Sequence, residues 1–196
     1  MSAPENNEEV FKLAPFNPSS EQIQEKAMTL LALNEDDVLF DLGCGDGRLL
    51  IAAAKKNPGL RCVGVEIDGK FVKRGMDEIA TLSQDLRDRV QLREEDVLQQ
   101  PVANNATTTT SEKQLSDLTL MDDATALYLF VLPKGVLKIM PILEALVKKR
   151  VDEQRYFRVL SYMFKIHDWE PTVVDKTAKG GCPVYLYEFN KPKESM

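Results

Sequence analysis

The stretch VLFDLGCGDGR, residues 38–48, decides the fold, because it joins a short apolar run to three glycines at alternate positions. Residues 38–42 are apolar enough to predict a strand that is buried on both faces of a sheet. Gly43, Gly45 and Gly47 then predict a turn in which a ligand can approach the main chain closely. A helix is expected directly afterwards, over residues 48–56, so the stretch predicts a strand, a ligand-binding turn and a helix in that order.

The rest of the chain continues this alternation of strands and helices. The apolar patterns predict strands over residues 62–67, 90–93, 125–131, 156–164 and 183–189, and helices after Ser19 and over residues 70–82 and 135–149. Ser19 with Gln22 fits a capping box for the first helix. Alternating strands and helices predict an α/β fold with a parallel sheet covered on both faces. The last strand has no helix before it, so we expect an antiparallel hairpin with residues near 172–176 through the Gly180–Gly181 turn.

The length of 196 residues suits one domain with its own core. We expect residues 1–18 to be a flexible lead and residues 19–196 to form that domain. Residues 102–117 are polar and low in complexity, with four threonines in a row at residues 107–110. They predict a surface loop inserted before the strand over residues 125–131, and a tolerated insertion is favoured over a functional lid.

Composition restricts the partners and the compartment. The net charge of −6 disfavours nucleic acid, because phosphate binding depends on clustered Lys and Arg, and favours a basic partner such as a lysine-rich protein segment. Cys44, Cys62 and Cys182 lie far apart with no CxxC, which disfavours a disulfide framework and a zinc site. No apolar run approaches the roughly 18 residues of a membrane span. The first ten residues resemble no signal or transit peptide, so a cytoplasmic location is expected and a mitochondrial one is left open.

Carboxylates accompany the ends of the first three predicted strands: Asp41 in the first, Glu66 in the second and Asp96 after the third. Because ligands of a parallel sheet bind beyond the carboxyl ends of its strands, these acids and the glycine turn are expected to share one site. Glu66 stands about 20 residues beyond the glycines, where an acid hydrogen-bonds ribose hydroxyls. Asp96 could meet the exocyclic amine of a base, with Glu94 and Glu95 as adjacent alternatives. Three acids and no Lys in the loop suit a ligand with ribose, adenine and positive charge but no phosphate, such as S-adenosylmethionine.

Three motifs in this order, DLGCGDGRLL, GVEID at residues 64–68 and REEDV at residues 93–97, resemble those of the class I S-adenosylmethionine-dependent methyltransferases. The resemblance covers residues 35–190 and implies a Rossmann-like, doubly wound, mostly parallel seven-stranded sheet with an antiparallel C-terminal hairpin. It implies S-adenosylmethionine as the cofactor and S-adenosylhomocysteine as its product. Carried over by position, it implies that Asp41, Gly43 and Gly45 line the methionine part, that Glu66 binds the ribose hydroxyls, that Ile67 flanks the adenine, and that Asp96 with Val97 holds the adenine edge.

A narrower resemblance involves FNPSS at residues 16–20, YLFVLP at residues 128–133 and SYMFKIHDWEP at residues 161–171. Together with the glycine motif, these are similar to a subgroup of small bacterial methyltransferases and mitochondrial protein-lysine methyltransferases. In that subgroup the region matching residues 16–20, which begins here with Phe16, closes over the cofactor, and the end of the fourth strand borders the acceptor site. The resemblance implies N-methylation of protein lysine, with a lysine-containing protein as the partner and no membrane partner.

N-methylation of lysine is expected to need an aromatic pocket for the acceptor side chain. A lysine must lose a proton before it attacks, and its free pKa of about 10.4 would be lowered in a dry pocket. Tyr128 and Trp169 are the candidate catalytic residues of that wall, because each carries a polar atom on an aromatic ring. Phe130 and Phe164 could equally be core residues. His167 could be a base near neutral pH, although a solvent-exposed loop histidine is favoured.

Other functions stay open from the sequence. A small-molecule methyltransferase usually needs inserted helices over a roomy pocket, and this short chain shows no such insertion. A non-catalytic protein that binds the cofactor and a partner is disfavoured by the intact glycines and acids. A nicotinamide dehydrogenase is disfavoured by Arg48, which stands where the dinucleotide fingerprint has a small residue.

Overall fold

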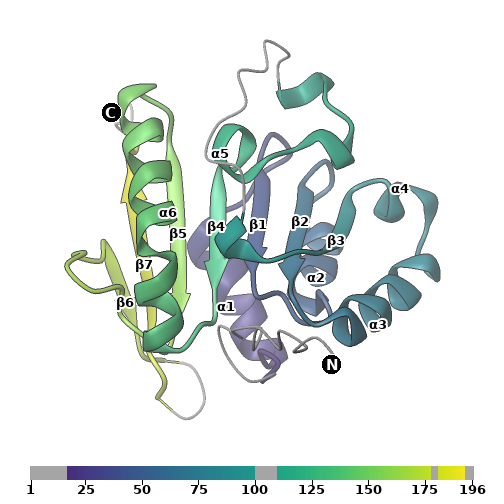
Figure 1. Cartoon of the computed structure of the whole chain (residues 1–196), viewed down its shortest axis with the longest axis horizontal. Helices are drawn as coiled ribbons and strands as arrows, with labels where there is room; N and C mark the ends of the chain where they lie inside the picture. Colours follow the sequence, from purple (N-terminus) through teal and green to yellow (C-terminus); the bar gives the residue numbers. More distant parts are fainter. Residues whose placement is uncertain (1–16, 100–109, 178–180, 193–196) are drawn as a thin grey trace, which may run out of the picture.

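A seven-stranded sheet runs through the centre of the computed structural model, which describes residues 17–99, 110–177 and 181–192 (Figure 1). Its strands are β1 (Val38–Leu42), β2 (Arg61–Glu66), β3 (Val90–Glu94), β4 (Ala126–Leu129), β5 (Phe157–Tyr162), β6 (Val173–Asp175) and β7 (Val184–Phe189). They lie in the order β3-β2-β1-β4-β5-β7-β6. β7 is antiparallel to both of its neighbours, whereas the other adjacent pairs are parallel. The predicted Rossmann-like sheet with an antiparallel C-terminal hairpin is confirmed.

Helices cover both faces of this sheet. They are α1 (Glu21–Leu31), α2 (Arg48–Lys56), α3 (Gly69–Ala80), α4 (Gln84–Arg87), α5 (Leu120–Asp123) and α6 (Pro133–Asp152), with short 3-10 helices η1 (Val97–Gln99), η2 (Thr110–Glu112) and η3 (Leu115–Asp117). α1, α2 and α3 share one apolar core with the sheet, and α5 and α6 share another. Figure 1 shows α6 in front of β5 and β7, with α1 and α2 behind the sheet. Among the described helices, none is long and apolar enough to cross a membrane.

The predicted elements agree with the structure to within a few residues at their ends. β4 is shorter than the predicted strand, because it ends at Leu129 and Pro133 already starts α6. Proline suits the first position of a helix, where its missing N–H is not needed. The predicted hairpin is confirmed by the pairing of β6 with β7, although Gly180 lies outside the described residues.

The predicted capping box of α1 is wrong by one residue. Ser20 is the N-cap, and its hydroxyl accepts a hydrogen bond from the N–H of Ile23 at 3.4 Å. Ser19 turns toward β4 instead, where its hydroxyl oxygen lies 2.6 Å from that of Tyr128. A tertiary contact therefore takes the first serine and leaves the local cap to the second.

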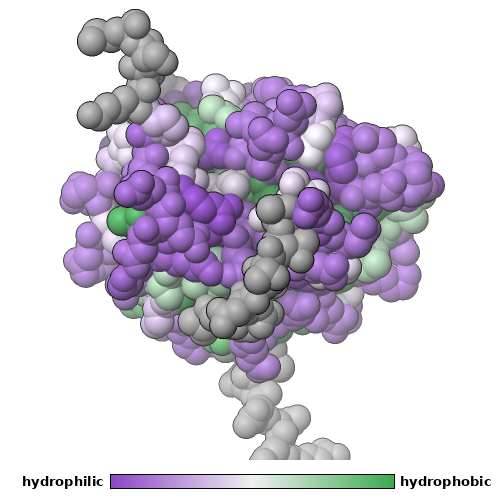
Figure 2. Space-filling view, turned by 90° about the horizontal axis from the view of Figure 1, so that it is seen from above, coloured by the Kyte–Doolittle hydropathy of each residue, from purple (hydrophilic) through white to green (hydrophobic). Residues whose placement is uncertain are grey.

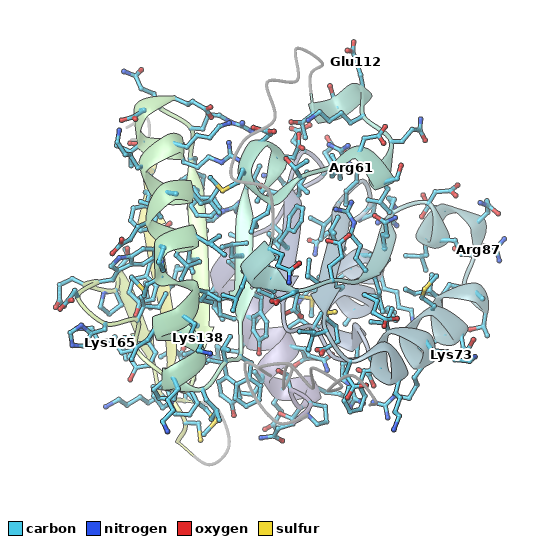
Figure 3. The ribbon with its side chains drawn as sticks, in the orientation of Figure 1. Arg61, Lys73, Arg87, Glu112, Lys138 and Lys165 are labelled. Carbon is cyan, nitrogen blue, oxygen red and sulfur yellow. The ribbon has the colours of Figure 1, made fainter. Side chains whose placement is uncertain are left out.

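The predicted insertion lies only partly within the described residues, which begin again at Thr110 after the gap at residues 100–109. Its described part is held by Arg61, which donates to the carbonyl of Thr110 at 2.7 Å, and by Arg93, which donates to the carbonyl of Leu115 at 2.9 Å. Arg61 begins β2, so its contact with Thr110 lies at the amino edge of the sheet, where Figure 3 shows Arg61 and Glu112, whereas Arg93 stands near the end of β3. The described part therefore begins at the opposite edge from the glycine turn.

The amino edge presents a mainly hydrophilic surface. Seen from above, onto this edge, apolar side chains show only in small separate areas (Figure 2). The amino edge therefore offers no large apolar surface to a ligand among the residues that the structure describes.

A buried ion pair joins several elements beneath this surface. Arg158 of β5 pairs with Asp37, which precedes β1, and both are almost completely buried. Arg158 also donates to the carbonyls of Leu31 and Ala32, at 2.5 Å and 3.1 Å, where α1 ends. Thr125 donates its hydroxyl hydrogen to Asp37 at 2.6 Å. The end of α1 and the starts of β1, β4 and β5 are thus tied to one charge pair.

We expect Asp37→Asn to lower the free energy of unfolding by about 3 kcal/mol, because it leaves the Arg158 guanidinium buried without its counter-charge. Urea unfolding followed by circular dichroism would measure the change. Asp36→Asn, at the exposed neighbouring carboxylate, is the matched control and should change stability by less than about 0.5 kcal/mol. Equal midpoints for the two variants would contradict this account.

Candidate functional site

The turn between β1 and α2 is built from glycines in left-handed conformations. Gly43, Gly45 and Gly47 have φ values of 84°, 57° and 70°. The N–H of Gly43 donates to the carbonyl of Val65 in β2 at 2.8 Å, so the turn is tied to the neighbouring strand. A Cβ placed on Gly43 would meet no atom within 4 Å. Glycine is needed at residue 43 for its backbone angle, and the space beside it is left open.

Two further glycines let other elements lie against this turn. A Cβ on Gly75 of α3 would be 2.4 Å from the carbonyl oxygen of Asp46, and a Cβ on Gly64 of β2 would be 2.5 Å from the Sγ of Cys44. Sequence reasoning did not single out Gly75, because nothing local distinguishes a glycine that packs against a distant main chain. Its signal is a glycine in the middle of an otherwise ordinary helix.

A cavity of about 360 Å³ opens beside the turn, at the carboxyl ends of the strands. The predicted site residues that line it are Asp41, Gly43, Gly45, Glu66, Ile67, Asp96, Val97 and Tyr128. Phe16, the remaining predicted cofactor contact, lies outside the described residues. Residues of five separate segments of the chain therefore meet at one cavity, as expected at the switch point of a doubly wound sheet.

Asp41 is an acid held in an unfavourable environment. Its side chain is almost completely buried, and burial, together with the charge of Glu66, raises the pKa of Asp41 well above its usual value. A carboxylate in this position gains most from a cationic ligand, which would replace the solvation that burial removes. The site is therefore electrostatically prepared for positive charge.

Glu66 and Asp96 are oriented by main-chain N–H groups. One Glu66 oxygen accepts from the N–H of Gly45 and the other from the N–H of Asp68, both at 2.9 Å. Asp96 accepts from the N–H of Leu98 at 2.9 Å. Each carboxylate oxygen keeps a further lone pair, so both side chains can still accept hydrogen bonds from a ligand.

The second acid of the turn, Asp46, is neutralised within the protein. Arg48 and Arg74 form ion pairs with its carboxylate at 2.7 Å and 2.5 Å. Burial alone would raise the pKa of Asp46, but the hydrogen bonds and charges of the two arginines lower it below its usual value. Arg48 thus has a structural partner at the position where a dinucleotide fingerprint has a small residue.

Tyr128 forms part of the cavity wall together with the segment before α1. Its hydroxyl bonds that of Ser19, and Gln24 donates to the Ser19 carbonyl at 2.9 Å. Asn17, Pro18 and Ser19 line the cavity. Burial raises the pKa of Tyr128 above its usual value, so the phenol stays neutral.

Comparison with known proteins agrees with this geometry. Residues 40–122 match the sequence model of a family described as a methyltransferase domain. A protein-lysine N-methyltransferase of Saccharolobus islandicus (strain REY15A) is 27% identical over 181 residues, which are 91% of this chain and 96% of that protein. The crystal structure of an RNA methyltransferase from Salinibacter ruber in complex with S-adenosyl-L-homocysteine is also 27% identical, with a TM-score of 0.64, and the match covers 91% of this chain and 98% of that one.

Together these matches support a class I S-adenosylmethionine-dependent methyltransferase. The fold alone is shared with a precorrin-6y C5,15-methyltransferase from Geobacter metallireducens GS-15, which is 14% identical, with a TM-score of 0.54 and coverage of 87% of this chain and 88% of that one.

The structure does not bring every predicted aromatic residue to the cavity. Trp169 is absent from the cavity lining and packs edge-on against Tyr187 and Phe189, with ring centroids 5.6 Å and 5.3 Å apart. The loop after β5 turns back onto the core shared with α6, and the indole of Trp169 packs against this core. His167 is mostly exposed beside Asp168, as the favoured interpretation expected, and Phe164 does not line the cavity either.

Phe130 does line the cavity, and its ring has a partner that sequence reasoning missed. The Tyr162 ring at the end of β5 lies 4.6 Å from it, centroid to centroid. The pairing of β4 with β5 places these residues side by side beyond the ladder, so strand register was the signal that could have found Tyr162. Phe130 is therefore both a wall of the cavity and half of an aromatic pair.

Gly75→Ala should lower the free energy of unfolding by about 1–3 kcal/mol, because its methyl group would force α3 away from the main chain of Asp46. Thermal or urea unfolding measures the cost. Met76→Ala is the control, since that side chain is 54% exposed on the same helix. If Gly75→Ala proved as stable as Met76→Ala, the close approach of α3 to the turn would be discounted.

Proposed function

We propose that this methyltransferase transfers a methyl group from S-adenosylmethionine to the side-chain nitrogen of lysine in a protein substrate. The observation that carries the proposal is the carboxyl-edge cavity, where buried acids and an open glycine turn meet aromatic side chains. Similarity to a protein-lysine N-methyltransferase over nearly the whole of both chains supports lysine as the acceptor. A net charge of −6 also suits a basic acceptor better than a phosphate-rich one.

S-adenosylmethionine matches the charges of the cavity lining. It carries a sulfonium and an ammonium group and has no phosphate, so Asp41 and Glu66 would attract it and would repel a nucleotide phosphate. We assign the methionine part of the cofactor to Asp41, Gly43 and Gly45. The open space beside Gly43 supports this assignment, because a ligand can there reach the main chain.

The adenosine part is assigned to the side of the cavity formed by the ends of β2 and β3. Glu66 would accept hydrogen bonds from the ribose hydroxyls with its remaining lone pairs. Ile67 would flank the adenine ring, and Asp96 with Val97 would meet its edge. Asp96 is held in place for this role by the N–H of Leu98.

When bound, S-adenosylmethionine supplies an activated methyl group: the new N–C bond forms as the C–S bond breaks, and S-adenosylhomocysteine is released. The chain's own residues align the acceptor and exclude water. The lysine ammonium must first release a proton to solvent, and burial against Phe130 and Tyr128 lowers its pKa and favours the neutral amine. Tyr128 is the catalytic residue that we retain, because its neutral phenol oxygen can accept a hydrogen bond from the amine.

Asp41 gives a pH signature of cofactor binding. A bound cation favours the carboxylate, so binding lowers the raised pKa of Asp41 and releases a proton. We expect the affinity for S-adenosylmethionine to rise as the pH increases through the raised pKa of free Asp41, and to level off once free Asp41 is ionised. The affinity for S-adenosylhomocysteine, which lacks the sulfonium charge, should rise less.

Isothermal titration calorimetry with both ligands measures these affinities, and buffers of different ionisation enthalpy report the released proton. Asp41→Asn should weaken binding of S-adenosylmethionine and remove the difference in pH dependence between the two ligands. An identical pH dependence for the two ligands in the unmodified protein would remove Asp41 from the methionine site.

The acceptor is tested by transfer of labelled methyl from S-adenosylmethionine into a fractionated cell lysate. We expect label in protease-sensitive material that yields methyl-lysine on hydrolysis. Gly45→Arg, which fills the turn with a cationic side chain, should abolish transfer and cofactor binding, and it is the control for contaminating activity.

A second candidate acceptor is RNA, since the similar Salinibacter ruber structure is that of an RNA methyltransferase. Label in nuclease-sensitive material only would select RNA and reject lysine, while keeping the fold and the cofactor. Label in small molecules only would select the small-molecule alternative. Cofactor binding with no transfer to any fraction would select the non-catalytic alternative.

A further inference from the structure

The start of α6 carries an exposed surface that combines apolar and basic side chains. Leu132 and Leu137 are 41% and 60% exposed, and Lys134 and Lys138 are exposed beside them. Lys134, Leu137 and Lys138 are three and four residues apart, so they share one face of the helix. We call Leu132, Lys134, Leu137 and Lys138 the α6 rim.

The α6 rim adjoins the acceptor side of the cavity. Phe130 and Val131 line the cavity, and Leu132 follows directly as the N-cap of α6. Figure 3 shows Lys138 at the end of α6 that lies toward the carboxyl edge. η1 also contacts α6, and its Leu98 is 36% exposed. A protein whose lysine entered the cavity would therefore lie across this surface.

The charges of the rim and of the cavity have opposite signs. The cavity lining contains Asp41, Glu66 and Asp96, whereas the rim contributes two lysines in a chain of net charge −6. The sequence therefore places apolar and basic side chains together beside the site that receives a lysine.

Resting on the proposed lysine methyl transfer, we propose that the α6 rim docks an acidic, apolar segment of the protein substrate beside the target lysine. The lysine is drawn into the acidic cavity, while acidic and leucine-like side chains meet Lys134, Lys138 and the exposed leucines. Charge complementarity of this kind sets partner choice and encounter rate more than raw affinity. The rim is thus expected to favour lysines with acidic neighbours, although the net charge of −6 taken alone favours a basic partner.

The helix geometry sets where those neighbours stand. Leu132 and Lys138 are separated by about 9 Å along α6, at about 1.5 Å per residue. An extended substrate covers about 3.3 Å per residue, so about three consecutive substrate residues span the rim.

A matched pair of fluorescent peptides tests the proposal. The acidic peptide has a central lysine flanked on each side by Gly and then Glu-Leu-Glu, so that its direction of binding does not matter, and the neutral peptide has Gln in place of every Glu. Fluorescence anisotropy measures binding to the protein loaded with S-adenosylhomocysteine, and methyl-lysine formation is measured with S-adenosylmethionine. We expect the acidic peptide to bind about fivefold more tightly, less so at high salt.

Charge reversal supplies the decisive comparison. The double variant Lys134→Glu with Lys138→Glu should lose or invert the preference for the acidic peptide, while cofactor affinity is unchanged. Lys55→Glu with Lys56→Glu makes the same charge change at exposed residues at the end of α2 and should keep the preference. Equal loss in both double variants would show an effect of net charge alone and would overturn the docking site.

The remaining outcomes also decide the matter. Equal binding of the two peptides by the unmodified protein overturns the proposal, even if lysine in lysate protein is methylated. Binding to vesicles of anionic lipid that depends on Lys134 and Lys138, without a preference for the acidic peptide, overturns it in favour of a membrane surface. Rim-dependent peptide binding without methyl transfer to any lysine would support the docking site and reject the proposed function.

Discussion

The main chain of the β1–α2 turn can lie against β2 and α3 only because no side chain stands between them. At Gly64 and Gly75 even a single carbon would collide with the turn, and at Gly47 it would meet Leu92. These close contacts fix the position of the turn relative to β2 and α3. The cavity is then the space that the turn leaves between itself and the tips of β2 and β4. Packing behind the turn therefore contributes to the shape of the cavity.

Asp41 in β1 and Asp46 in the turn that follows have opposite electrostatic environments. Asp46 is surrounded by two arginines and holds α2 and α3 to the turn, whereas Asp41, five residues earlier, faces the cavity with its charge destabilised by burial. The first arrangement contributes to the fold, whereas the second leaves a destabilised carboxylate at the cavity. A buried carboxylate of the second kind is costly to the free protein, which supports its interpretation as a functional group.

The sequence was most informative where local pattern and tertiary structure agree. The apolar run before the glycines, the acids at strand ends and the final hairpin were predictable, because a parallel sheet brings the carboxyl ends of its strands to one edge. The outcome for Ser19 and Ser20 was not predictable, since two adjacent serines compete for one cap and a residue 109 positions away decides between them. Trp169 was placed at the acceptor wall from its chemistry, but the direction in which a loop folds back depends on contacts with Tyr187 and Phe189 that no local pattern encodes.

The attachment of α1 at both ends has a mechanical consequence. Its carboxyl end is clamped by Arg158 of β5, and the residue before its N-cap is bonded to Tyr128 of β4. A helix fastened to the sheet at two points cannot swing as a lever. Asn17 and Pro18 line the cavity but are held by neither of these two contacts. A ligand that displaced these two residues would therefore leave α1 and the core undisturbed.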